Sequence, residues 1–390
     1  MKENTFVLSK RLQALPPYLF LELDKAKRLA RSEGRDIIDL GIGDPDLPTP
    51  DYIIQALDRA ALEPANHRYA LDQGLPVFRQ AISQWYNSRF NVTLDINTEI
   101  LPLIGSKEGI AHFPLGIINP GDYTLVPDPC YPPYKGGTIF AGGKVHLMPL
   151  LEKNDFLIDL KAIPAGVLKK ARVIYINYPN NPTGAVCDIN FYKSIVKFAR
   201  KNKLIVVSDL AYSEMSYDGF KPPSFLEVDG AKEVGIEFHS LSKTCNMTGW
   251  RVGWACGNKD LVAALAKVKS NIDSGIFSAL QVAAVAALEG SVGQIKKMSE
   301  IYQNRRDSLV EGLNSLGWDI KKPKATFYVW SRIPKKICSI DFSRELLAKA
   351  DIVATPGVGF GKYGEGYIRF ALTVPKERIA EALIRLKKIW

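Results

Sequence analysis

The chain has 390 residues, 46% hydrophobic and 24% charged, which is typical of globular proteins and long enough for two domains. No run approaches the roughly 18–20 apolar residues that span a membrane, so no membrane association is expected. The five cysteines are scattered and never form a Cys-x-x-Cys pair, which indicates reduced thiols and a cytoplasmic location. The four histidines lack metal-ligand spacing, so no metal is expected.

The net charge is +10, and the basic side chains are spread along the whole chain. A nucleic-acid-binding protein would gather them on one face or one element. We therefore expect no nucleic-acid partner. A positive balance without clustering suits a small anionic cofactor or substrate equally well.

The first predicted element is an amphipathic helix over about Tyr18–Ser32, and a Gly/Pro/Asp-rich passage follows at Gly41–Pro50. The middle of the chain then alternates short β-branched runs with helical patterns such as Asn190–Lys201. This alternation predicts an α/β fold with a mostly parallel sheet covered by helices on both faces. The predicted strands are Ile100–Ile104, Tyr123–Val126, Arg172–Asn177 and Leu204–Ser208.

The last part of the chain carries two further strand runs, Thr326–Ser331 and Tyr367–Leu372, and a closing helix. We expect both chain ends to form one smaller domain and the middle to form a larger one. The predicted boundaries are residues 1–48 for an N-terminal arm and part of the small domain, 49–287 for the large domain and 288–390 for the small C-terminal domain.

Polar residues follow the predicted strands where an open parallel sheet binds its ligands, beyond the carboxyl ends of the strands. Gly105-Ser106-Lys107 opens a helical pattern, whose free N–H groups suit a phosphate, although a simple serine cap explains it as well. Prolines around Tyr131 hold its ring where it can stack on a flat cofactor, and a packing tyrosine is an equal alternative.

The next two strand ends carry an amide and a carboxylate. Asn181 lies in a proline-stiffened turn, where its side chain can donate to a cofactor oxygen. Asp209 ends its strand, with Tyr212 three residues later. A carboxylate at this place can keep a pyridine nitrogen protonated, while a helix cap is the alternative.

The segment from Ser240 to Gly253 is the most informative. Lys243 can form an imine with an aldehyde, provided that its pKa is lowered so that the amine is free. Ser240 and Arg251 bracket it, and both are good phosphate ligands. An exposed loop lysine would not explain why hydroxyls, glycines and an arginine surround it.

The pattern Ser-x-Ser-Lys-x(7)-Arg-x-Gly in this segment resembles the lysine signature of class I/II aminotransferases, which are pyridoxal 5'-phosphate (PLP) enzymes of fold type I. The resemblance implies a large domain with a mostly parallel seven-stranded sheet between helices, plus a smaller α/β domain from both chain ends. It covers nearly the whole chain in family order, at Gly43-x-Pro45, Tyr69 with Gly74, Gly105-Ser106-Lys107, Tyr131, Asn181-Pro182-x-Gly184, Asp209-x-x-Tyr212, Lys243, Arg251 and Arg369.

The resemblance implies a catalytic set of Lys243, Asp209 and Tyr212. Lys243 would hold PLP as a Schiff base and carry a proton, and Asp209 would pair with the pyridine nitrogen. Asn181 and Tyr212 would bond the phenolic oxygen, and Tyr131 would stack on the ring.

The resemblance also implies a homodimer with shared active sites. The phosphate would be held by Ser106, Lys107, Ser240 and Arg251, and by Tyr69 from the neighbouring subunit. Arg369 would grip the α-carboxylate of the amino-acid or 2-oxoacid substrate.

Several stretches, among them LGIGDPDLPTP and SLSKTCNMTGWRVGW, resemble the family branch that transfers an amino group between LL-diaminopimelate and 2-oxoglutarate in lysine biosynthesis. Asp72 matches an acid that reaches from the partner subunit toward the second charged end of that substrate. The loop around it departs from the common bacterial form Tyr-Pro-Ser-Tyr-x-Gly. The other residues that match the substrate pocket are Tyr18, Ile42, Gly43, Lys107, Tyr131, Asn181 and Arg369.

Two alternatives stay open at this point, and a third is set aside. Relatives with a similar lysine segment use alanine or aspartate with glutamate. A PLP β-lyase can share every cofactor residue. A PLP-binding regulator would need a DNA-binding domain ahead of the fold, for which the N-terminal part is too short.

Overall fold

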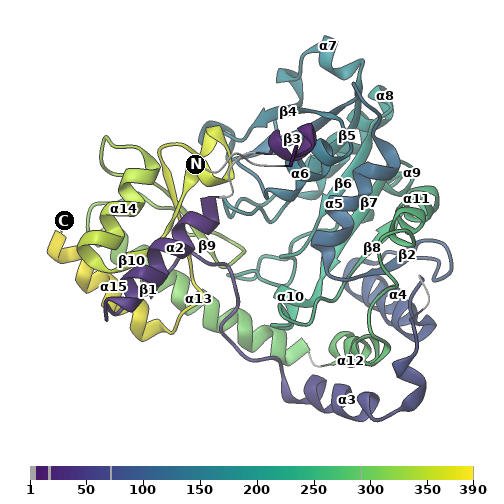
Figure 1. Cartoon of the computed structure of the whole chain (residues 1–390), viewed down its shortest axis with the longest axis horizontal. Coiled ribbons are helices and arrows are strands. Elements are labelled where there is room, and N and C mark those ends of the chain that lie inside the picture. The colour runs from purple at the N-terminus through teal and green to yellow at the C-terminus, as the bar shows by residue number, and fades with distance from the viewer. Residues whose placement is uncertain (1–5, 16–18, 71–72, 291, 390) are drawn as a thin grey trace.

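A computed structural model describes residues 6–15, 19–70, 73–290 and 292–389, and its centre is a seven-stranded sheet between helices (Figure 1). The strands lie side by side in the order β2-β8-β7-β6-β5-β3-β4. The pairs among β3–β7 are parallel, whereas β8 runs antiparallel to both of its neighbours. The strands are β2 (Ile100–Leu103), β3 (Tyr123–Asp128), β4 (Lys144–Pro149), β5 (Ala171–Ile176), β6 (Ile205–Asp209), β7 (Gly235–Ser240) and β8 (Gly253–Gly257). The predicted α/β fold class and its mostly parallel sheet are confirmed.

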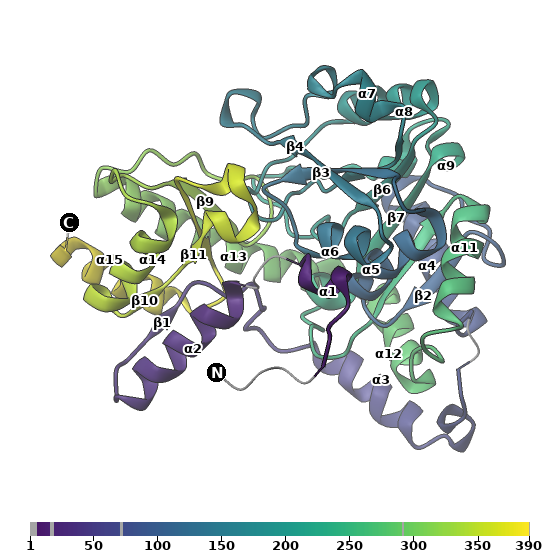
Figure 2. The same cartoon turned by 45° about the horizontal axis from the view of Figure 1, so that its top comes forward.

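Both faces of this sheet are buried, as its continuous apolar strands require. On β5, Val173 and Tyr175 point into one apolar core and Ile174 and Ile176 into another, because successive side chains of a strand alternate between faces. One core is covered by α5 (Ser106–Ile117), α6 (Pro133–Phe140) and α11 (Lys259–Lys269). The other is covered by α3 (Asp51–Ala61), α4 (Pro76–Phe90), α8 (Ile189–Asn202) and α12 (Ser278–Glu289) (Figure 2).

A second group of elements comes from both ends of the chain. Strand β1 (Ile38–Asp39) pairs in parallel with β10 (Ile352–Val353), and a three-stranded sheet has the order β11-β12-β9. The other elements of this group are α2 (Leu19–Ser32), α13 (Val292–Ser315), β9 (Tyr328–Arg332), α14 (Ser339–Ala350), β11 (Thr355–Pro356), β12 (Tyr367–Ala371) and α15 (Lys376–Ile389). The short helices of the chain are α1 (Lys10–Gln13), α7 (Ala165–Leu168), α9 (Ala231–Val234) and α10 (Leu241–Thr244). The domain boundaries at 48/49 and 287/288 stay a prediction.

The segment that follows β6 connects the two groups of elements. Tyr212 and Met215 are buried in the same apolar cluster as Leu40, Phe327 and Phe370. The carboxyl end of β6 therefore meets the residues contributed by the chain ends, which places ligand-binding groups from both parts next to each other.

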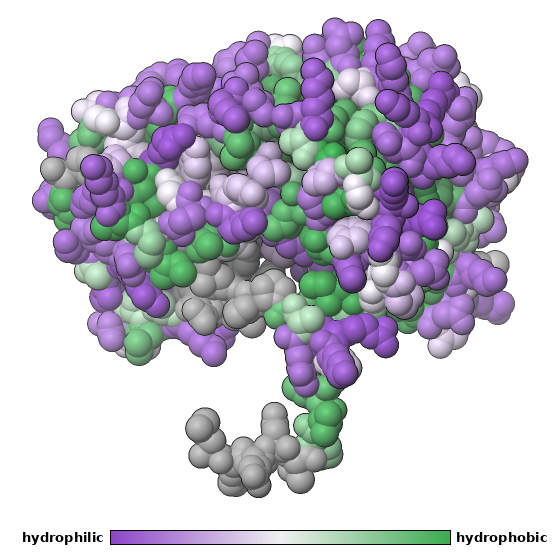
Figure 3. Space-filling view, turned by 90° about the horizontal axis from the view of Figure 1, so that it is seen from above, coloured by the Kyte–Doolittle hydropathy of each residue, from purple (hydrophilic) through white to green (hydrophobic). Residues whose placement is uncertain are grey.

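Hydrophilic side chains cover most of the face seen in Figure 3, and a narrow segment with apolar side chains projects from it. In the N-terminal segment of the described chain, Phe6 and Val7 are 80% and 99% exposed. None of the helices in the described part of the chain combines the length and the apolar character of a membrane span.

Candidate active site

A cavity of about 350 Å³ lies at the carboxyl ends of β5, β6 and β7, where the sequence places its polar residues. The chain ends contribute to its wall through Ile42–Asp44 and Tyr328. The predicted site residues that line it are Ile42, Gly43, Ser106, Lys107, Tyr131, Asn181, Asp209, Tyr212, Ser240, Lys243 and Arg251.

Asp209 is buried at the end of β6, and its two carboxylate oxygens have different surroundings. The Tyr134 hydroxyl donates to Oδ2 at 2.7 Å. Oδ1 is buried and accepts no hydrogen bond from the described residues, although Asp209 lines the cavity. Burial raises the pKa of Asp209 to about 6, against the opposing effects of the Tyr134 hydroxyl and the backbone N–H of Ala211. Such an acceptor suits a ligand that brings an N–H donor.

Lys243 belongs to α10, directly after β7, and its amine lies in the cavity. Nζ donates to the carbonyl oxygen of Gly43 at 2.9 Å. Burial lowers the pKa of Lys243 to about 8; the nearby Asp44 opposes this shift, whereas Arg369 and Arg251 add to it. A larger fraction of the amine is therefore neutral near pH 7 than for an ordinary lysine, and the neutral amine is the nucleophile.

One end of the cavity is suited to a phosphate. Gly105 precedes α5 with a φ of +74°, and a Cβ there would lie 2.2 Å from Nη2 of Arg251. Glycine thus lets the arginine approach the first turn of the helix, where backbone N–H groups and the helix dipole favour anions. Ser106 and Ser240 line the same cavity and add hydroxyl donors.

Arg369 lies beside Asn181 and is held by fixed partners. Nη1 donates to Oδ1 of Asn181 at 2.9 Å, and Nη2 donates to the carbonyl oxygen of Gly41 at 2.7 Å. The guanidinium carbon is 4.1 Å from the centre of the Tyr328 ring and 4.6 Å from that of Phe360. A planar cation held between two rings suits a carboxylate in a bidentate arrangement.

Tyr212 points its hydroxyl toward the hydroxyl of Tyr328, with an O–O distance of 3.1 Å. Burial holds the pKa of Tyr212 well above its ordinary value. The phenol therefore stays protonated, which suits a hydrogen-bond donor to a ligand oxygen.

Four predicted site residues are not among the residues that line this cavity. One of them is Arg369, which instead contacts Asn181 and Tyr328. Tyr69 is 86% exposed and does not line the cavity. Tyr18 and Asp72 lie outside the described residues. The contact of Tyr69 with another subunit therefore stays a prediction.

The structure also brings in residues that the sequence analysis did not single out. Asn177 donates to the carbonyl oxygen of Asp209 at 2.8 Å, and its Oδ1 accepts from the backbone of Asn181 at 2.9 Å. Tyr134 bonds Asp209, and Tyr328 contacts both Tyr212 and Arg369. Tyr134 was an available signal, because it follows Tyr131 by three residues and lies in the first turn of α6.

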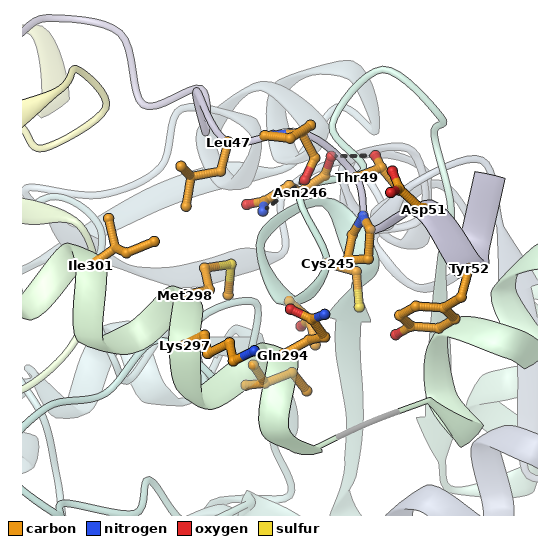
Figure 4. A pocket seen from close by; sticks show the side chains of 14 residues that line it. Leu47, Thr49, Asp51, Tyr52, Cys245, Asn246, Gln294, Lys297, Met298 and Ile301 are labelled. Carbon is orange, nitrogen blue, oxygen red and sulfur yellow. Dashed lines mark hydrogen bonds between the residues drawn. The ribbon is translucent and has the colours of Figure 1, made fainter.

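A second cavity, of about 340 Å³, adjoins the segment after Lys243 (Figure 4). The Thr49 hydroxyl donates to the backbone oxygen of Asn246 at 2.8 Å, which ties the N-terminal passage to that segment. Burial raises the pKa of Cys245, the thiol in this cavity, to about 12, so the thiol stays neutral. The Cys245 thiol is therefore not an activated nucleophile comparable with Lys243.

Comparison with known proteins shows which family the chain resembles. The family model described as aminotransferase class I and II matches residues 35–386. The chain is 54% identical, over 98% of both chains, to the LL-diaminopimelate aminotransferase of Moorella thermoacetica. It is 55% identical to the protein of the same name from Syntrophobacter fumaroxidans, over 98% of this chain and 99% of that one. The substrate-bound structure of BacF from Bacillus subtilis superposes with a TM-score of 0.96 at 38% identity, covering 99% and 98% of the two chains.

Proposed function

Because the chain belongs to the class I and II aminotransferases, a family of PLP-dependent transaminases, we propose that it transfers an amino group between LL-diaminopimelate and 2-oxoglutarate in lysine biosynthesis. The observation that carries this proposal is the identity of more than half the residues with relatives of that name over nearly the full length. The class of reaction is not part of this proposal, because the family itself shows it. The enzyme is a transaminase, and its substrates are small amino and 2-oxo acids.

The cavity offers groups that fit the parts of PLP. The unpartnered Oδ1 of Asp209 matches a protonated ring nitrogen, and the amine of Lys243 matches the aldehyde. Ser106, Ser240 and Arg251, with the backbone of Lys107, suit the phosphate. When bound, PLP supplies an electron-withdrawing ring to which the electrons of a broken Cα–H bond can move.

Each side chain of the site has a distinct task in this proposal. Asp209 keeps the proton on the ring nitrogen, and Asn181 and Tyr212 donate to the phenolic oxygen. Lys243 would hold the cofactor by its aldehyde, and its amine, when free, would accept and return the proton of the substrate Cα–H bond. Arg369 orients the substrate by its α-carboxylate, and the Tyr131 ring packs against the cofactor ring.

We also propose that the enzyme is a cytoplasmic homodimer with shared active sites. Two exposed features support a second copy: the apolar residues Phe6 and Val7 of the N-terminal segment, and the side chain of Tyr69. Asp72, three residues after Tyr69, is the proposed contact to the distal end of the substrate from that second copy. The free thiols, of which Cys130, Cys187, Cys245 and Cys256 are buried, support a reducing compartment.

The visible absorption of the holoenzyme tests the substrate directly, because one half-reaction changes the cofactor without any oxoacid. We expect LL-diaminopimelate to bleach the visible band at low concentration, and alanine or aspartate to do so only at much higher concentration. If alanine bleaches the band and diaminopimelate does not, the substrate proposal is wrong while the transaminase stands. Lys243→Ala should lack the half-reaction with every amino acid.

A further inference from the structure

Tyr328 lies at the first position of β9 and is 3% exposed, yet it lines the cavity. It comes from the C-terminal part of the chain, far in sequence from the strand ends that carry Asp209 and Lys243. Its ring and its hydroxyl contact different members of the site, so the two parts of the side chain can be considered separately.

The hydroxyl of Tyr328 contacts the side of the site that holds Tyr212 and Lys243. It lies 3.1 Å from the Tyr212 hydroxyl. It also lies close over Gly43, since a Cβ on that glycine would be only 1.9 Å from the hydroxyl oxygen. The carbonyl of the same glycine accepts the hydrogen bond of Lys243 at 2.9 Å. The Tyr328 hydroxyl can occupy this position only because residue 43 is a glycine.

The ring of Tyr328 contacts the side that holds Arg369. The guanidinium carbon is 4.1 Å from the ring centre, and Phe360 packs against the same guanidinium at 4.6 Å. Cation–π contacts stabilise a buried arginine, and together these two fix the plane of its guanidinium. A fixed plane is what a bidentate grip on a carboxylate requires.

We infer that Tyr328 is a positioning residue with two separable roles: its hydroxyl orients the Tyr212 phenol, and its ring fixes the plane of Arg369. When Tyr212 donates its proton to a ligand oxygen, its own oxygen is left to accept from Tyr328. A donor that itself accepts a hydrogen bond is polarised and donates more strongly. The phenolic oxygen of the cofactor is thus held more firmly as an anion while the Tyr328 hydroxyl is present.

The charged and titratable groups around this pair are few. Asp209 and Arg369 face Tyr212, in addition to Tyr328 itself. Asp44, Arg369 and Arg251 act on Lys243. Removing only the Tyr328 hydroxyl leaves all of these charges in place, so a change in titration would report the lost hydrogen bond.

Two substitutions separate the two roles. Tyr328→Phe keeps the ring and removes the hydroxyl, whereas Tyr328→Leu removes both. The matched control is Tyr86→Phe, which removes a buried hydroxyl that donates to Glu237 at 3.0 Å and does not line the cavity. Thermal unfolding of each variant shows whether it is folded.

The first readout is the pH at which the visible band of the holoenzyme changes, measured without substrate. Both Tyr328 variants should raise this midpoint by about half a pH unit or more, the equivalent of somewhat less than one hydrogen bond. The control should keep the wild-type midpoint. A wild-type midpoint in Tyr328→Phe overturns the role of the hydroxyl.

The second readout is the affinity for glutarate and pimelate, dicarboxylates without an amino group to react. Tyr328→Phe should bind both as the wild type does, and Tyr328→Leu should bind them about ten-fold more weakly, the loss expected for one cation–π contact. Equal affinity in the two Tyr328 variants overturns the role of the ring, whether both stay at the wild-type value or fall together.

Discussion

Two buried carboxyl groups lie on neighbouring strands of the large sheet, Asp209 on β6 and Glu237 on β7. They differ in how many hydrogen bonds their oxygens accept. Glu237 accepts four hydrogen bonds, from the side chains of Tyr86, Ser208 and Ser224 and from the backbone of Phe225, at 2.6–3.0 Å. Asp209 accepts one side-chain bond, from Tyr134, and its other oxygen has no partner among the described residues.

Burial raises the pKa of both groups, to about 6 for Asp209 and about 7 for Glu237. A raised pKa therefore does not distinguish a functional carboxyl from a structural one in this sheet. The difference lies in the unmatched oxygen beside a cavity, since a native structure seldom leaves a buried acceptor unsatisfied without a functional reason. Glu237 instead joins α4, β6 and the segment at Ser224 within the core.

Asp209→Asn should give the largest effect, a loss of turnover without a loss of stability. We expect kcat to fall by about a hundred- to a thousand-fold, the loss seen when one preorganised electrostatic partner is removed. The unfolding temperature should hold or rise, because the amide removes a charge that is costly to bury. Single-turnover rates and thermal unfolding of the same preparation check both parts. A stable variant with wild-type turnover would contradict the assignment.

Glu237→Gln should show the opposite pattern. Its amide offers one oxygen and one NH₂ group where four donors converge, so two donors are left without an acceptor. We expect the free energy of unfolding to fall by about 2 kcal/mol, with kcat per folded molecule unchanged. Denaturant unfolding gives the first quantity and a titration of active sites the second. Loss of turnover in the folded variant would show that the contrast with Asp209 is wrong.

The pH dependence of the unfolding free energy gives a smaller difference between the wild type and Glu237→Gln. The pKa of Glu237 rises from 4.5 to about 7 on folding, so its contribution is present below about pH 4.5 and is lost as the pH rises to about 7. The slope is at most about 1.4 kcal/mol per pH unit. Glu237→Gln should lose stability less steeply than the wild type across this window. Parallel curves of unfolding free energy against pH would contradict the titration of Glu237.

Much of the site was predictable from the sequence because its members lie beside strand ends. Asn181, Asp209 and Lys243 each follow a β-branched or apolar run within a few residues, and the position of a strand end in a parallel sheet already implies a shared ligand. Four strands of this sheet, β2, β3, β5 and β6, were predictable to within two residues, because their runs are apolar and both of their faces are buried. The strands β4, β7 and β8 were not predicted.

The remaining contacts depend on tertiary packing that no local pattern contains. Arg369 bonds the carbonyl of Gly41 across 328 positions of the chain. From the sequence, Tyr328 is indistinguishable from other strand residues, and only the fold places it beside Tyr212 and over Gly43. Tyr134 reads as a helix residue until its hydroxyl meets Asp209. A backbone oxygen or a buried phenol carries no recognisable motif, so such partners emerge only from the structure.

The most direct test of the central claim is nitrogen-15 NMR of the holoenzyme reconstituted with PLP labelled at the ring nitrogen. If the unmatched oxygen of Asp209 serves that nitrogen, the wild type should show a protonated ring nitrogen at neutral pH, and Asp209→Asn should show an unprotonated one. Glu237→Gln should match the wild type. A protonated nitrogen in Asp209→Asn, or an unprotonated one in the wild type, would contradict the account.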